Sequence, residues 1–247
     1  MSIKKIIISQ KAPQNTVPYN ALTEKYGVSI DFKPFFAIEA LSSREFRAQR
    51  VDLLAYTAVV FSSRHVIDAY FQLCDELRVK VPETMKYFCT SEAVAMYLQK
   101  HIVYRKRKIF FGTATPESVV ALITDRHAKE KFLITAVENS NNDALTSLFD
   151  KKGLDYSVAV FVKSVVLDIK DINLNDYDMA VLYNPNDVQS LFENFPDFRQ
   201  GDLKFVSFGK NVVKSMTDAG LKIEIQAPTP ECPSVVMTLE QYLKQNN

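Results

Sequence analysis

Polar residues follow several short apolar runs of this sequence, at positions suited to ligand binding. A residue that ends a strand and begins a helix lies where free backbone N–H groups and the positive end of the helix dipole favour carboxylates. In α/β folds, that edge of the sheet is also where ligands bind. The same residue types cap helices, so a purely structural role is the alternative for each of them. The candidate binding residues are Ser62, Ser63, Thr90, Ser91, Asn184, Asn186, Gly209 and Lys210.

Residue types that form metal, nucleotide or nucleophile sites are too scattered here to suggest one. The sequence has 3 cysteines, 3 histidines and 6 glycines. The odd number and wide spacing of the cysteines argue against a disulfide framework, and no histidine stands at metal-ligand spacing from a cysteine or another histidine. No two glycines are close enough to form a dinucleotide fingerprint or a phosphate-binding loop. We therefore expect free thiols, no bound metal and no cofactor, and the sequence assigns no catalytic residue.

The overall composition is that of an ordinary globular protein. The 247 residues are 47% hydrophobic and 24% charged, with a net charge of +1, which suggests one large or two medium domains. A balanced charge gives no reason to expect a nucleic-acid partner. The apolar run near the N-terminus is too short for a secretory signal, and no stretch approaches the ~18 apolar residues that span a membrane. We expect a cytoplasmic protein without a membrane partner.

Short apolar runs alternate with amphipathic segments along the chain. The runs lack the polar alternation of half-exposed strands, which is typical of strands buried on both faces of a parallel sheet. Strand-helix alternation of this kind predicts βαβ units. Strands are expected at 5–8, 57–61, 85–89, 132–136, 178–183 and 203–207, and helices at 64–77, 92–100, 144–152, 187–195 and 211–219.

Local helix signals agree with this pattern. Ser42 and Glu45 have the spacing of a capping box, and Thr115 precedes a proline at a first helical position. Gly27, Gly153 and Gly220 each follow a helical pattern, where a left-handed residue is expected.

The sequence also repeats itself. The run Lys5–Ile8 matches 131–134, and Gly27 matches Gly153, both at an offset of 126 residues (131 − 5 and 153 − 27). Further on, Phe61 aligns with Tyr183 at an offset of 122, and Met85 with Leu203 at an offset of 118. Each half therefore repeats one strand-helix order, and the offset changes as loop lengths would change it. We interpret the chain as an internal duplication.

With these features, the sequence resembles the uroporphyrinogen-III synthase family over almost its whole length. The similar segments occur in the family's order. They are the segment 28–34 that ends in proline, the strand and helix start 58–66, the glycine-containing helix start 206–210, and the stretch 225–230 before the last helix.

The resemblance implies two similar parallel-sheet βαβ domains joined by two extended linkers. One domain would be discontinuous, residues 1–35 and 163–247, and the other would be inserted, residues 36–162, with linkers at 37–41 and 158–162. It also implies a reaction, the closing of hydroxymethylbilane into a macrocycle with inversion of the last pyrrole ring and loss of water. The partner would be this linear tetrapyrrole, held in a cleft between the domains of a monomer.

The sequence departs from the family at several polar positions. Thr90 stands where the family has a glycine, and family threonines fall on Ala93 and Val212. A family tyrosine implicated in proton delivery aligns with Val162 or Phe161, and neither can donate a proton. These departures favour the alternative function, a catalytically silent relative that binds a small anionic or tetrapyrrole ligand in a hinged cleft.

A dense basic run, Arg105 to Lys108, precedes a short apolar run at 109–111 that we expect to be a further strand. It could attract a polyanionic substrate or an acidic partner. We favour the simpler interpretation of a solvated loop.

Overall fold

The computed structural model describes residues 3–246 and divides the chain into two compact units. Unit 1 comprises Met1–Ala37 and Val165–Asn247, and unit 2 comprises Ile38–Ser164. The chain therefore passes from one unit to the other twice. Both passages lie two residues beyond the predicted ones, after residue 37 instead of 35 and after residue 164 instead of 162.

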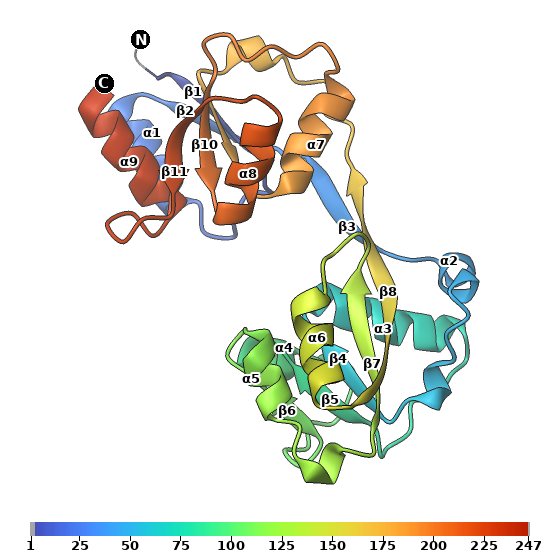
Figure 1. The fold of residues 1–247 in the computed structure, drawn as a ribbon. Helices are drawn as coiled ribbons and strands as arrows, with labels where there is room; N and C mark the ends of the chain where they lie inside the picture. Colours follow the sequence, from blue (N-terminus) through green and yellow to red (C-terminus); the bar gives the residue numbers. More distant parts are fainter. Residues whose placement is uncertain (1–2, 247) are drawn as a thin grey trace. The chain divides into compact units, whose positions relative to one another are not determined.

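Unit 1 is a five-stranded parallel sheet covered by helices on both faces (Figure 1). The strand order is β11-β10-β9-β1-β2. The strands are β1 (Lys5–Ile8), β2 (Ser29–Phe32), β9 (Met179–Leu182), β10 (Lys204–Phe208) and β11 (Ile223–Ala227). Helices α1 (Val17–Tyr26) and α9 (Val235–Asn246) pack on one face, and α7 (Pro185–Asn194) and α8 (Lys210–Asp218) pack on the other.

Unit 2 is a six-stranded sheet in the order β3-β8-β7-β4-β5-β6. The strands are β3 (Phe36–Ala40), β4 (Ala58–Phe61), β5 (Lys86–Cys89), β6 (Ile109–Phe111), β7 (Lys131–Val137) and β8 (Asp155–Val166). Helices α3 (Arg64–Glu76) and α4 (Glu92–Tyr97) pack on one face, and α5 (Pro116–Ala121) and α6 (Asp143–Lys151) on the other. A short helix, α2 (Ser43–Ala48), follows β3.

The predicted linkers form a strand pair. The Leu41 amide donates to the Phe161 carbonyl, and the Leu167 amide donates to the Phe35 carbonyl. Residue numbers rise along one strand while they fall along the other, so β3 and β8 are antiparallel. The sheet of unit 2 is therefore parallel except at this edge, and both passages between the units lie within the pair.

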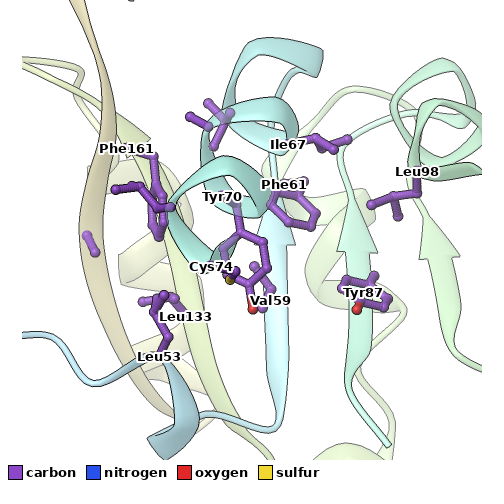
Figure 2. Close-up of a cluster of buried hydrophobic side chains, with 14 of the residues drawn as sticks. Leu53, Val59, Phe61, Ile67, Tyr70, Cys74, Tyr87, Leu98, Leu133 and Phe161 are labelled. Carbon is purple, nitrogen blue, oxygen red and sulfur yellow. The ribbon is translucent and has the colours of Figure 1, made fainter. Parts of the chain in front are cut away.

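The strands are buried as their unalternated sequences predict. Every residue of β4 and of β9 is buried, because helices cover both faces of each sheet. Figure 2 shows one such core, in which Phe61, Tyr70 and Phe161 lie together beside Cys74. Burial raises the pKa of the Cys74 thiol to about 11. The cysteines are free and buried, as expected of structural thiols.

The predicted caps are present in the structure. Ser42 and Glu45 form the capping box of α2, and the Thr115 side chain accepts from the Ser118 amide at the start of α5. Gly27, Gly153 and Gly220 have left-handed φ angles of 66°, 64° and 73°. Local sequence signals therefore place the ends of these helices correctly.

Strand pairing confirms the internal repeat and corrects one of its offsets. Ile8 pairs with Val181 and Ile134 pairs with Val60. The offset from Ile8 to Ile134 is 126, as predicted, and that from Val60 to Val181 is 121. The predicted offset of 122 in this segment was wrong by one residue, because the sequence alone does not show which residue ends each strand. The offset of 118 for β5 and β10 holds, since Ala58 pairs with Lys86 and Met179 with Lys204.

Each unit combines pieces of both sequence halves. In unit 1, β1, α1 and β2 come from the first half, and the elements from β9 to α9 come from the second. In unit 2, the elements from β4 to α5 come from the first half, and β7, α6 and β8 come from the second. Both sheets then have the same strand order, with β2-β1-β9-β10-β11 matching β8-β7-β4-β5-β6.

Candidate functional site

Each unit brings its candidate residues to the carboxyl edge of its sheet. Ser62 and Ser63 follow β4, and Thr90 and Ser91 follow its neighbour β5. In unit 1, Asn184 and Asn186 follow β9, and Gly209 and Lys210 follow its neighbour β10. In each sheet, successive strands are added in opposite directions on the two sides of one central pair. This pair is β4 and β7 in unit 2, and β1 and β9 in unit 1. The strand order reverses at this pair, and ligands of such sheets bind outside the carboxyl ends at this reversal point.

The start of α3 offers hydrogen-bond donors to a ligand. Ser63 is the N-cap, and its Oγ accepts from the Val66 amide at 3.4 Å. The amides at the first two helical positions, Arg64 and His65, have no partner within a helix. Ser62 is exposed beside them, and its carbonyl accepts from the Thr90 hydroxyl at 3.2 Å. The loops after β4 and β5 are thus tied together, with hydroxyls and amides at their surface.

The start of α4 resembles that of α3. Ser91 caps the helix by accepting from the Val94 amide at 3.4 Å. An acidic residue, Glu92, occupies the first helical position, and Ala93 the second. The carboxylate makes this helix start less favourable for an anion than that of α3.

The start of α8 is open and carries a cation. Gly209 is the N-cap with a φ of 128°, a conformation that L side chains rarely adopt, and its amide donates to the Ala227 carbonyl at 2.7 Å. No side chain of the described residues caps this helix. The first helical amides, from Lys210 onward, and the exposed Lys210 side chain are therefore available to a carboxylate.

The start of α7 is closed by the protein's own groups. The Asn184 amide donates to Asp187 Oδ2 at 2.9 Å, and the next residue, Pro185, has no N–H. The Asn186 amide donates to Asn184 Oδ1 at 3.0 Å, and the Asp187 amide donates to the Asn184 carbonyl at 2.9 Å. Asn184 is therefore a helix cap, the structural alternative for this residue. We expected free amides at the helix start after β9, and this expectation was wrong. Residue 185 is a proline, and the amides of Asn184, Asn186 and Asp187 are already hydrogen-bonded within the loop.

Asp187 is the principal polar residue that the sequence interpretation missed. Its side chain is fully buried and also accepts from the Tyr183 amide at 2.8 Å. Burial raises the pKa of Asp187 to about 6, although the Tyr183 and Asn184 amides and the Ser9 hydroxyl lower it. Asp187 Oδ1 and Ser9 Oγ are both buried without a partner in standard hydrogen-bond geometry among the described residues. The spacing from Asn184 to Asp187 is the sequence signal that could have identified this cap.

Two tyrosines adjoin the same edge of unit 1. Burial raises the pKa of Tyr183, and the neighbouring Tyr19 hydroxyl raises it further. Burial also raises the pKa of Tyr19, while its hydrogen bond with Tyr183 lowers it. Both phenols therefore stay protonated near neutral pH and can donate hydrogen bonds.

Other features lie elsewhere or give no site. A cavity of about 650 Å³ lies at the amino edge of the unit 1 sheet, where Tyr177, Asp178 and Lys204 contribute to its lining. Sheets of this kind bind ligands at the opposite, carboxyl edge.

Among residues 3–246, no group of three or more His, Cys, Asp or Glu side chains could hold a metal ion. In the same range, no helix combines the length and apolarity needed to cross a membrane. The residues Arg105 to Lys108 form a loop before β6.

Comparisons with known proteins agree with this architecture. The uroporphyrinogen-III synthetase of Helicobacter pylori 26695 has a TM-score of 0.61 and 15% identity, and the match covers 98% of this chain and 100% of that one. A mutant uroporphyrinogen III synthase from the extremely thermophilic bacterium Thermus thermophilus has a TM-score of 0.55 and 14% identity, with 98% of both chains covered. At these identities the likeness establishes the fold. No curated protein matches the sequence.

The family assignment comes from the sequence. Residues 17–237 match the family model described as uroporphyrinogen-III synthase HemD. This match includes every candidate residue and spans parts of both units. The chain therefore belongs to the uroporphyrinogen-III synthase family, whose role is in tetrapyrrole biosynthesis.

Proposed function

We propose that this protein is a uroporphyrinogen-III synthase that converts hydroxymethylbilane into the macrocycle, with inversion of the last ring and loss of water. The family match over residues 17–237 is the observation that carries this proposal. The open starts of α3 and α8 support it, because the linear substrate has eight carboxylates and each of these helix starts can bind one.

Substrate positioning is the main catalytic contribution that we propose. Loss of the hydroxyl group leaves an electrophilic azafulvene, which closes without inversion when it is free in water. The protein must therefore hold the chain in the inverting geometry, and effects of this kind can supply several kcal/mol. Ser62, Ser63 and the α3 amides would fix carboxylates on unit 2, and Gly209 and Lys210 on unit 1. Thr90 and Ser91 would orient the adjoining loop. We propose that turnover needs no cofactor.

An isomer assay tests the proposal. The protein is incubated with enzymatically generated hydroxymethylbilane, the products are oxidised, and the uroporphyrin isomers are separated by chromatography. We expect the type III isomer in excess of a control without protein. Type I alone, at the rate of spontaneous closure, would contradict synthase activity.

A specific observation favours the catalytically silent alternative. The family tyrosine implicated in proton delivery aligns with Val162, or with Phe161 on a one-residue shift; both residues are buried in unit 2, and neither can donate a proton. Val212, at the position of a family threonine, is also buried. If uroporphyrin binds but hydroxymethylbilane closes only to type I, the protein is a binding relative.

The cellular setting that we propose follows from the substrate. We expect a cytoplasmic monomer that takes a small linear tetrapyrrole and has no nucleic-acid or membrane partner. Size-exclusion chromatography with light scattering would check the monomeric state, for which the expected mass is 28.1 kDa.

A further inference from the structure

The equivalent reversal-point loops, residues 62–66 in unit 2 and 183–187 in unit 1, differ in sequence, and their last position differs in charge. Strand pairing relates Val60 to Val181, so the same offset of 121 relates Ser63 to Asn184 and Val66 to Asp187. Ser63 and Asn184 are both N-caps, and Val66 and Asp187 each lie three residues further on. Both side chains are fully buried. The duplicated position therefore holds a carboxylate in unit 1 and a methyl-bearing side chain in unit 2.

The Asp187 carboxylate takes the donors that an external anion would use. Oδ2 accepts from both the Tyr183 and the Asn184 amides, at 2.8 and 2.9 Å. Backbone amides at a helix start are the usual partners of a bound carboxylate or phosphate. No side-chain oxygen at Val66 can do the same in unit 2.

We propose that Asp187 is an internal anion that closes the α7 start of unit 1 to ligand carboxylates, which restricts anion binding after the central strands to the α3 start of unit 2. Asp187 is then a specificity-determining residue, because Pro185 and Asn184 already close the first helical positions and Asp187 takes the two amides that precede them. Its negative charge would also repel a second carboxylate at the same place. This inference rests on the proposed function for the identity of the ligand.

Inorganic phosphate tests the inference without requiring turnover. Backbone amide shifts of the full-length protein are followed by NMR during a phosphate titration near pH 7.5. In the wild type, we expect the Tyr183 and Asn184 amides to be unresponsive at phosphate concentrations that shift the Ser63, Arg64 and His65 amides. In Asp187→Val, which installs the unit 2 residue, Tyr183 and Asn184 should respond. Asp187→Ser is the second variant if the valine variant does not fold: its hydroxyl can accept from only one of the two amides, so at least the other amide should respond.

The reciprocal variant gives an independent result. Val66→Asp should form a capping box with Ser63 and reduce the apparent phosphate affinity at the α3 start at least 10-fold. A wild-type response at Tyr183 and Asn184, or silence of these amides in the folded Asp187 variants, would overturn the inference. These outcomes are separate from the isomer assay, because a protein without synthase activity would still show which loop accepts an anion.

Discussion

At the scale of single residues, the hydroxyl and carboxyl groups at the carboxyl edges have both structural and ligand-binding uses. The Ser63 hydroxyl accepts from the Val66 amide, so its hydrogen can still be donated to a ligand. The Asp187 carboxylate instead satisfies two backbone amides inside the protein. Residue type alone does not distinguish these uses. Both Ser63 and Asn184 are candidate binding residues from the sequence, with a cap role favoured for Asn184, and their partners in the structure separate them.

Ser63→Ala should reduce ligand affinity more than stability. A hydrogen bond to a charged group contributes about 1.5–3 kcal/mol, so uroporphyrinogen affinity should fall roughly 10-fold or more. Loss of the cap should cost about 1 kcal/mol of unfolding free energy. Ser42→Ala is the matched control, because it removes an N-cap outside the candidate site. If both variants lose stability and neither loses affinity, Ser63 is only a cap.

Asp187→Asn should change the pH dependence of stability. The pKa of Asp187 is about 6 in the folded protein and 3.8 in its unperturbed state. Since the folded state binds the proton more tightly, the stability from this group is present below pH 3.8 and is lost as pH rises through 6. The unfolding free energy of wild type relative to the asparagine variant should therefore fall by up to about 3 kcal/mol between roughly pH 4 and 7. Urea unfolding at several pH values measures this difference.

Asp68→Asn is the control with the opposite sign. Burial tends to raise the pKa of Asp68, but hydrogen bonds from Tyr97 and His101 lower it overall. The stability from this carboxylate is therefore present above its unfolded pKa and is lost as pH falls. The unfolding free energy of wild type relative to each asparagine variant should change with pH in opposite directions at the two sites. If both differences change in the same direction, burial does not control the pKa of Asp187.

At the scale of elements, the sequence predicts the central strands β1, β4, β5, β7, β9 and β10 and several helix starts, because their signals are local. Unalternated apolar runs correspond to β4, β5 and β9, and the Ser42 and Thr115 caps are found as predicted. Pairing between distant segments leaves a weaker signal. The antiparallel pairing of β3 with β8 and the one-residue correction between Val60 and Val181 follow only from the strand register.

Helix α7 is hydrogen-bonded to both passage segments, the segments of unit 1 through which the chain leaves this unit and returns to it. The buried Ser190 hydroxyl donates to the Phe35 carbonyl at 2.6 Å. The Asn194 side chain donates to the Leu167 carbonyl at 2.9 Å and accepts from the Ile169 amide at 3.1 Å. One helix thereby fixes the chain before β3 and after β8.

Asn194→Ala should destabilise the protein by about 2–4 kcal/mol, because it leaves the partly buried Leu167 carbonyl and the buried Ile169 amide without this partner. Gln189→Ala on the same helix is the control. The Gln189 side chain is exposed and bonds to Glu193, so its removal should change the unfolding free energy by roughly 0.5 kcal/mol or less. Equal urea midpoints for the two variants would show that α7 does not hold the passage segments.

At the scale of the whole molecule, the duplication explains why each unit contains both halves of the sequence. The repeat predicts two similar sheets, and the matching strand orders confirm it. The family match then gives the role in tetrapyrrole biosynthesis. The sequence repeat could not reveal that the duplicated loops differ in their hydrogen bonding, because that difference depends on the bonds made by Asp187.

The fraction of type III uroporphyrin formed from hydroxymethylbilane is the measurement that tests the synthase proposal most directly. The fraction is determined at increasing concentrations of the wild-type protein, with and without a metal chelator. We predict that it rises with protein concentration until type III predominates, and that the chelator has no effect. A product that stays type I at every protein concentration would contradict the account.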